Sequence, residues 1–122
     1  EEEKLKALCR GTHRDQQGFE AMLRYVRNVT AVHQECMMIR RQTWQALGGF
    51  ACAPAGYEAV DLCLRGEEKG LSNVWTPYSA HKRNGHGKQA DKHTQEFAEK
   101  WSERLAHDDA YYNPNLKKLG LV

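Results

Sequence analysis

The sequence predicts a single α+β domain in which helices flank a small sheet. Segments with a helical spacing of apolar residues alternate with segments rich in β-formers, in the order helix, strand, helix, helix, strand, helix. The chain of 122 residues also fits one domain, and a domain of this size buries roughly two thirds of its unfolded surface. We therefore expect residues 1–122 to form one folded unit.

Composition argues against several classes of protein. Hydrophobic residues make up 40% of the chain and charged residues 28%, which is typical of a soluble globular domain. A net charge of +2 gives no argument for nucleic-acid binding, and no apolar run approaches the roughly 20 residues that span a bilayer. The start, EEEKLK, has the wrong charge for a signal peptide and lacks an initiator Met, so we expect a fragment of a larger protein.

Cysteine spacing bears on metal binding and on location. Cys9, Cys36, Cys52 and Cys63 form no CxxC pair, so a zinc site has little support. Without a secretory signal, reduced thiols in the cytoplasm are the default. We expect a cytoplasmic protein, either free or at the inner face of the membrane.

Residues 1–27 are predicted to form an N-terminal helical segment. Residues 1–9 are charged and favour a helix, residues 10–18 form a polar break, and residues 19–26 have amphipathic helical spacing. The apolar positions of that last helix are Phe19, Met22, Leu23 and Val26.

Residues 28–108 are predicted to form the core of the domain. Residues 28–39 are rich in β-formers, so at least part of them should be a strand, with Cys36 in the core and away from His33 and Glu35. A short helix should follow, with Thr43 as a candidate N-cap and Gly48-Gly49 at its end.

The second half of this core region should contain a helix, a strand and another helix. Residues 57–70 should form a helix that ends at a glycine and has a stripe of apolar residues on its inner face. Residues 71–80 should form a strand that Pro77 interrupts or ends. Residues 93–108 give the clearest helical pattern, with Glu99 and Glu103 on the face expected to contact solvent. The two stripes are Val60, Cys63 and Leu64, and His93, Phe97, Trp101 and Leu105.

Residues 109–122 should form an irregular tail. They contain the motif YYNPNL, with two aromatic residues and two amides around a proline. Asn side chains often bond to turn backbone, so we expect a packed strap at the end of the chain.

Two acids and one base lie at helical spacing in YEAVDLCLR. Glu58 and Asp61 fall in the first turn of the predicted helix, and Arg65 stands four residues after Asp61. One interpretation is structural: the acids complement the helix dipole, and Asp61 pairs with Arg65. The other is functional: a carboxylate at a loop-to-helix junction acts as a general base or binds an acceptor.

The loop HKRNGHGK also has two interpretations. Lys82, Arg83 and Lys88 are cations that suit a phosphate, and His81 or His86 suits a metal. The alternative is a solvated basic loop without a ligand. Taken without other information, the sequence favours the solvated loop.

Three stretches together resemble the C-terminal half of a family 2 glycosyltransferase of the bacterial polysaccharide and O-antigen type. They are NVTAVHQECMMIRRQTWQALGGF, YEAVDLCLRGEEKGLSNVWTPYSA and FAEKWSERLAHDDAYYNPNL, and they cover roughly residues 28–116. Members of that family typically read GGFDE, then EDVDLCLR, and many end in DPYYNPNL. The order and spacing of the pieces carry the resemblance.

The resemblance implies the acceptor-side part of a GT-A fold, with a small mixed sheet and flanking helices. It implies a nucleotide-sugar donor, a polysaccharide or glycoconjugate acceptor, and Mg²⁺ or Mn²⁺ in the full-length enzyme. The family holds that metal with a DXD motif in an upstream, Rossmann-like nucleotide-binding half, which is absent here. We expect no metal bound to this chain and no transfer by it alone.

The resemblance assigns roles to individual residues. Glu58 and Asp61 are the catalytic candidates, and Gly48, Gly49, Phe50 and Arg65 would lie on the acceptor side. Ala59 stands where the family has the Asp that usually acts as general base, and Ala51-Cys52 replaces the Asp-Glu after GGF. In the basic loop, Lys82 and Arg83 would contact the diphosphate and His86 a metal.

These departures leave two main hypotheses. The chain is either the acceptor-side part of a glycosyltransferase or a degenerate, non-catalytic module that serves binding or assembly. An RNA-binding domain ranks last, because loop 81–92 lacks stacking aromatics. With the nucleotide-binding half missing, an exposed sheet edge should also favour a homodimer of the fragment.

Overall fold

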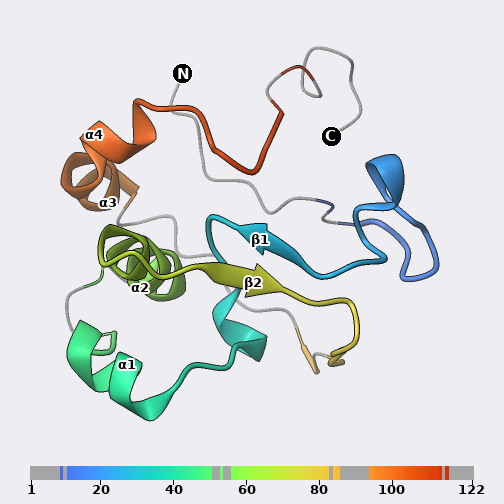
Figure 1. The fold of residues 1–122 in the computed structure, drawn as a ribbon, viewed down its shortest axis with the longest axis horizontal. Coiled ribbons are helices and arrows are strands. Elements are labelled where there is room, and N and C mark those ends of the chain that lie inside the picture. Colours follow the sequence, from blue (N-terminus) through green and yellow to red (C-terminus); the bar gives the residue numbers. More distant parts are fainter. Residues whose placement is uncertain are drawn as a thin grey trace.

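The computed structural model describes residues 9, 11–50, 53, 56–82, 84–85, 94–113 and 115. Helices gather at one end of the molecule and a two-stranded ribbon extends toward the other end (Figure 1). The described part is therefore mixed α and β, as the sequence predicts. The GT-A architecture is a finer statement, and it stays a prediction.

The ribbon pairs strand β1 (Arg27–Val29) with strand β2 (Asn73–Trp75). The strands are antiparallel, with Arg27 opposite Trp75 and Val29 opposite Asn73. Within the described residues the sheet has only these two strands, so it is antiparallel rather than mixed. The Arg27 guanidinium lies 5.6 Å from the centre of the Trp75 ring, and this cross-strand contact supports the register.

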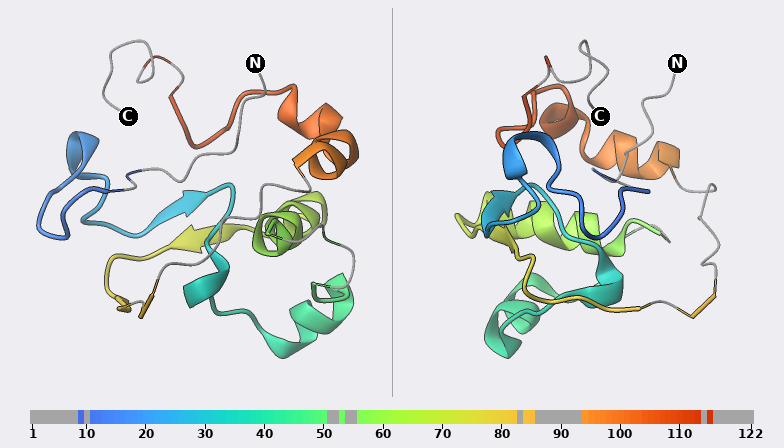
Figure 2. Two further views of the ribbon diagram at one scale, coloured as in Figure 1. Left: turned by 180° about the vertical axis from the view of Figure 1, so that it is seen from behind. Right: turned by 90° about the vertical axis from the view of Figure 1, so that its right-hand side faces the viewer.

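Helix α2 (Glu58–Glu68) lies between helix α1 (Arg41–Leu47) on one side and helices α3 (Thr94–Lys100) and α4 (Ser102–Leu105) on the other, as seen from the front and from behind (Figures 1 and 2). This position explains its burial, because both neighbours cover it. Ala59, Leu62, Cys63 and Leu64 are all buried. The predicted inner stripe is confirmed at Cys63 and Leu64, and Val60 packs partly buried beside it.

The apolar core joins α2 to the last two helices. Leu64, Phe97 and Trp101 form its buried centre, with Tyr57 packed against them. The rings of Tyr57 and Phe97 are stacked, with centroids 4.6 Å apart and planes inclined by 18°. Stacked aromatic pairs add to the stabilisation that burial alone gives. The prediction that Phe97 and Trp101 belong to the core is confirmed.

Side-chain hydrogen bonds tie the ribbon to the helices and to the tail. The amide of Asn73 donates to the carbonyl of Thr30 at 3.0 Å and to the carbonyl of Cys63 at 3.2 Å. The hydroxyl of Thr30 donates to the carboxylate of Asp109 at 2.6 Å. In the tail, Asn113 Oδ1 accepts from the backbone of Asn115 at 3.0 Å, which confirms that an Asn of YYNPNL satisfies turn backbone.

The predicted helix over 19–26 is wrong. Only a 3-10 turn, η1 (Phe19–Ala21), forms there. Gly18, Glu20 and Ala21 have positive φ angles, which a right-handed helix does not accommodate. Val26 is 50% exposed, so the apolar spacing of this segment does not produce a buried face at that position.

The predicted strand over 28–39 is confirmed only at its start. After β1 the chain forms a second 3-10 turn, η2 (Gln34–Cys36), capped by the His33 ring, which accepts from the Glu35 backbone. This turn exposes Cys36, so its predicted core position is wrong. The cysteine Sγ lies 4.0 Å from the hydroxyl of Ser79 instead.

Two helix boundaries also differ from the prediction. Helix α1 begins at Arg41, which places Thr43 inside the helix rather than at its N-cap. The helix predicted over 93–108 is interrupted at Trp101, whose φ of −109° and ψ of 20° are not helical. The interruption turns the last residues away from the core, and Leu105 is 43% exposed rather than buried.

Candidate functional site

A buried carboxylate forms the centre of the motif-bearing region. Asp61 is fully buried in helix α2. Its Oδ2 accepts from Arg65 Nε at 2.7 Å, and its Oδ1 accepts from Lys100 Nζ at 2.5 Å and from Trp101 Nε1 at 2.9 Å. We call Asp61, Arg65, Lys100 and Trp101 the Asp61 network. It links α2 to the end of α3 and to the residue that precedes α4.

Arg65 extends this network to the loop that follows α1. Its two terminal nitrogens donate to the backbone carbonyls of Leu47 and Gly49, the latter at 2.6 Å. The last carbonyls of a helix have no partner within the helix, so a guanidinium is well suited to them. One side chain therefore fixes the C-terminal end of α1 to helix α2.

The two glycines are explained by backbone conformation and by packing. Gly48 and Gly49 have φ angles of 77° and 59°, in the left-handed region that favours glycine. A Cβ at Gly49 would lie only 2.8 Å from the Trp44 ring, whereas a Cβ at Gly48 would meet nothing within 4 Å. Phe50 packs edge-on against Trp44, with centroids 4.8 Å apart. The GGF sequence thus forms an ordered corner, held by Trp44 and Arg65.

The ionisation of Asp61 reflects two opposing effects. Burial alone raises the pKa of a carboxyl, because it disfavours the charged form. Hydrogen bonds from Lys100, Trp101 and Arg65 outweigh that effect and hold the pKa of Asp61 below its ordinary value of 3.8. The group is therefore a carboxylate at neutral pH, with both oxygens occupied.

Glu58 has a different environment from Asp61. It lies partly exposed in the first turn of α2, and its Oε2 accepts from the backbone N–H of Gly56 at 2.8 Å. Ala59, the next residue along α2, is only 4% exposed. The side chain at position 59 thus points into the protein. Of the two carboxylates Glu58 and Asp61, solvent can reach only Glu58.

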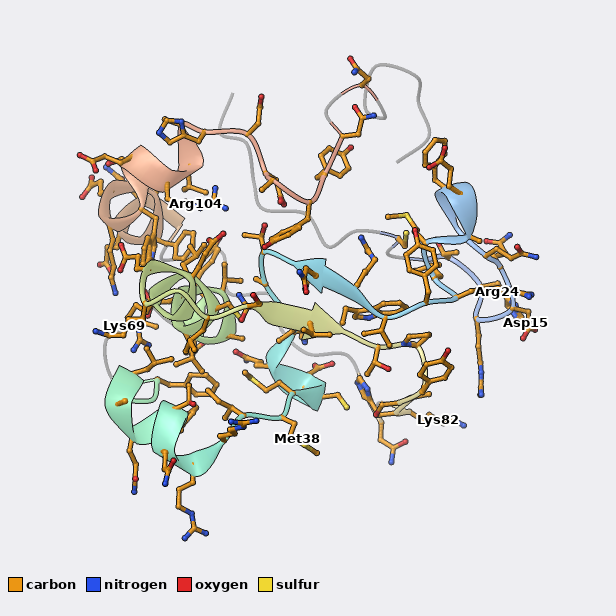
Figure 3. The ribbon with its side chains drawn as sticks, viewed as in Figure 1. Asp15, Arg24, Met38, Lys69, Lys82 and Arg104 are labelled. Atoms are coloured by element: carbon orange, nitrogen blue, oxygen red, sulfur yellow. The ribbon has the colours of Figure 1, made fainter. Side chains whose placement is uncertain are left out.

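The remaining predicted residues lie elsewhere or outside the described part. Lys82 is exposed at the opposite end of the molecule from Lys69 and Arg104 (Figure 3). The structure therefore does not bring Lys82 next to the Asp61 network. Arg83, His86 and Lys88 lie outside the described residues.

His81 takes part in a surface cluster. Its Nε2 and the Nδ1 of His33 each lie 3.9 Å from Glu35 Oε2. Among the described residues, no group of three or more His, Cys, Asp or Glu side chains is arranged to hold a metal ion. The described donors therefore do not fit an Mg²⁺ or Mn²⁺ site, and we assign no chemical step to a metal.

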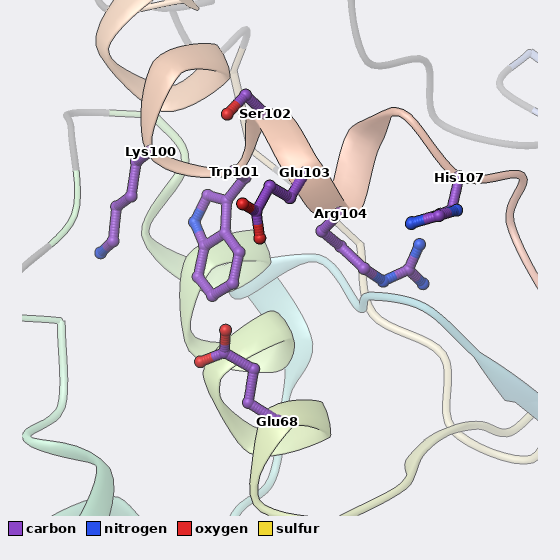
Figure 4. Close-up of a pocket in the computed structure, with 7 residues that line it drawn as sticks. All are labelled: Glu68, Lys100, Trp101, Ser102, Glu103, Arg104 and His107. Carbon is purple, nitrogen blue, oxygen red and sulfur yellow. The ribbon is translucent and has the colours of Figure 1, made fainter.

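Sequence reasoning missed the partners of Asp61 and the hollow beside them. Lys100 and Trp101 are 39 and 40 residues from Asp61, so no local spacing reveals the contact. Residues of α2, the end of α3 and α4 line a hollow of about 460 Å³ beside Trp101, and Figure 4 shows their side chains. Its lining residues are Glu68, Lys100, Trp101, Ser102, Glu103, Arg104 and His107.

A second, smaller hollow of about 220 Å³ is more apolar. It lies among α1, α2, β2 and the segment before α1, and its lining includes Met37, Ile39, Leu47 and Leu62. Met38, labelled in Figure 3, is 99% exposed at its edge. None of the predicted site residues lines this hollow.

Comparison with known proteins identifies little that is characterised. No protein-family model matches the chain, and no solved structure matches it. The chain is 28% identical over 111 residues to the uncharacterized protein y4gI of Sinorhizobium fredii (strain NBRC 101917 / NGR234). The match covers 81% of this chain and 12% of y4gI, so the chain spans a small part of that relative's length. Within the described residues, no helix combines the length and apolar character needed to cross a bilayer.

Proposed function

We propose that this chain is the acceptor-side part of a family 2 glycosyltransferase, which transfers a sugar from a nucleotide-sugar donor to a polysaccharide or glycoconjugate acceptor. The observation that supports this best is the Arg65 contact with Asp61 and with the carbonyls of Leu47 and Gly49. It joins GGF and YEAVDLCLR, two of the motifs that carry the resemblance, into one structural unit. This contact gives a structural reason for the two motifs to occur together at this spacing.

Within this proposal the two acids have separate roles. Glu58 is the candidate general base, because it is partly exposed at a loop-to-helix junction. It would accept the proton of the acceptor hydroxyl as that oxygen attacks the anomeric carbon of the donor, while the bond from that carbon to the diphosphate breaks and the nucleoside diphosphate leaves with its electron pair. Asp61 has no free oxygen for such a step, so it positions Arg65 and, through it, the GGF corner.

The test uses the whole encoded protein that carries this chain, incubated with UDP-, GDP- and dTDP-sugars, Mn²⁺ and bacterial glycan acceptors. We expect transfer, and we expect Glu58→Gln to reduce kcat by about 10²–10⁴-fold, the usual contribution of a general base. Glu99→Gln, on the exposed face of α3, is the matched control and should leave kcat unchanged. Equal rates for the wild type and Glu58→Gln would refute the assigned base.

Calorimetry of the 122-residue chain with UDP, GDP and dTDP plus Mn²⁺ is the complementary test. The proposal places the donor site outside this chain, so no binding is expected. Metal-dependent nucleotide binding by the chain alone would show that it holds a donor site, and the acceptor-side assignment would then be wrong.

A degenerate, non-catalytic module is the second candidate, and the burial of Ala59 favours it. The side chain at this position is 4% exposed, so an acid here would need a partner within the fold. A protein of this kind would bind glycan without transferring sugar. Glycan binding by the whole protein with no turnover for any of the three donors would support this second function over the first.

A further inference from the structure

The hollow between α2 and α4 has the size of a ligand site and a mainly polar lining. Its volume of about 460 Å³ falls within the roughly 300–1,000 Å³ of small-molecule pockets. The mostly buried indole of Trp101, 6% exposed, lies at the inner side of the hollow, and the carboxylates of Glu68 and Glu103 point toward it from two sides (Figure 4). Ser102, Arg104 and His107 complete the polar rim.

The charges of this rim narrow the chemical class of a ligand. Both cations already have carboxylate partners outside the hollow: Lys100 bonds to Asp61, and Arg104 bonds to Glu67 through two nitrogens at 3.1 and 3.2 Å. Glu68 and Glu103 make no side-chain hydrogen bond or ion pair within the described residues. An anionic ligand would therefore meet two carboxylates and no uncommitted lysine or arginine.

Other ligand classes fit less well for different reasons. An apolar ligand would desolvate six polar or charged side chains, and each one left without a hydrogen bond is costly. An organic cation would find the two carboxylates, but Asp61 is shared between Lys100 and Arg65, so positive charge exceeds negative charge within the Asp61 network beside the hollow and would repel the cation. A neutral ligand with several hydroxyl groups satisfies the whole rim, since its hydroxyls donate to Glu68 and Glu103 and accept from Ser102, Arg104 or His107.

We propose that this hollow binds one sugar ring of a glycan, with hydroxyl groups of the ring on Glu68 and Glu103. The inference rests on the proposed function, because the sugar would belong to the acceptor glycan. Lys100 and Trp101 line the hollow and also donate to Asp61, so the ligand contacts the same network that holds the GGF corner.

The experiment is an amide NMR titration of the full 122-residue chain with D-glucose, D-galactose, L-rhamnose and N-acetyl-D-glucosamine at millimolar concentrations. At least one sugar should shift the amides of residues 100–104, His107 and Glu68, together with the Trp101 indole N–H signal. Glu68→Ala and Glu103→Ala should each raise the Kd by about tenfold, the effect of one lost hydrogen bond to a charged group. Both residues are exposed, so these variants should keep the dispersed spectrum of a folded chain.

Glu99→Ala is the matched control, since Glu99 is an exposed glutamate of α3 outside the hollow, and it should leave the Kd unchanged. The inference is overturned if no sugar shifts these amides, if both glutamate variants bind as the wild type does, or if spermidine binds there in place of the sugars. These outcomes are separate from those of the transfer assay. Sugar binding without transfer would reject the catalytic function alone, and transfer with no sugar in the hollow would reject this inference alone.

Discussion

The helical end and the ribbon end of the molecule differ in how their contacts are made. At the helical end, the fully buried Asp61 accepts three side-chain hydrogen bonds beside an aromatic core. At the ribbon end, which comprises β1, β2 and the segments next to them, the Thr30–Asp109 and His81–Glu35 contacts lie at the surface. Val26, Val74 and Tyr78 are 50%, 51% and 82% exposed there. The motifs YEAVDLCLR and GGF thus lie in the part of the described structure with the most buried contacts.

The largest predicted effect comes from breaking the Asp61 network. Asp61→Ala leaves Arg65, Lys100 and Trp101 without their shared acceptor, and loss of one partner from a buried ion pair typically costs about 3–5 kcal/mol. We expect a loss of this size in the free energy of unfolding, measured by urea denaturation. Asp15→Ala removes a carboxylate that is 85% exposed and should change stability by less than about 0.5 kcal/mol. Equal losses for the two variants would contradict the comparison.

The next effect separates the two glycines of the GGF corner. Gly49→Ala combines a positive φ with a Cβ 2.8 Å from the Trp44 ring, whereas Gly48→Ala has the positive φ alone. Gly48→Ala should cost about 1–2 kcal/mol for the left-handed conformation, and Gly49→Ala about 1–3 kcal/mol more for overpacking. Thermal unfolding of both variants gives the difference directly. Similar melting temperatures would show that Trp44 moves aside at little cost.

Acid should weaken the helical end through the same carboxylate. Because the folded-state pKa of Asp61 lies below its ordinary value of 3.8, the unfolded chain binds more protons near that pH. The stabilisation is present above pH 3.8 and is lost as the pH falls through the lowered pKa. Urea midpoints measured from pH 7 to pH 2 should therefore fall less steeply at low pH for Asp61→Asn than for the wild type. Parallel curves would show that Asp61 does not contribute.

The smallest effect is expected at the ribbon end. Thr30→Val keeps the shape of the side chain and removes the hydroxyl that donates to Asp109. An exposed hydrogen bond of this kind contributes about 0.5 kcal/mol, so the urea midpoint should barely change. A loss above about 2 kcal/mol would place this contact in a cooperative network and would remove the contrast between the two ends.

Local spacing predicted the parts of the fold that local interactions determine. Helix α2 and the Asp61–Arg65 pair were both predictable, because residues four apart share a helix face. The other partners of Asp61 could not be predicted from local spacing, since Lys100 and Trp101 come from a distant segment of the chain. The burial of Asp61 was missed for the same reason.

The errors have a common physical origin. The strand predicted over 28–39 ends at Val29, because β2 offers only three residues to pair with. Leu105 followed the periodicity of a continuous helix, and the interruption at Trp101 removed it from the core. In each case, tertiary contacts or a local backbone change had a larger effect on the structure than the residue propensities and spacing on which the prediction was based.

The Arg65 contact with the carbonyls of Leu47 and Gly49 has a consequence for how such domains can diversify. The chain between α1 and α2 leaves from one fixed point, at Gly49, and returns to another, where Glu58 holds the backbone of Gly56. A connection anchored at both ends can be lengthened at a small entropic cost, about 0.6 kcal/mol for each doubling. Insertions between Phe50 and Gly56 would therefore change what the domain presents to a ligand while leaving its framework intact.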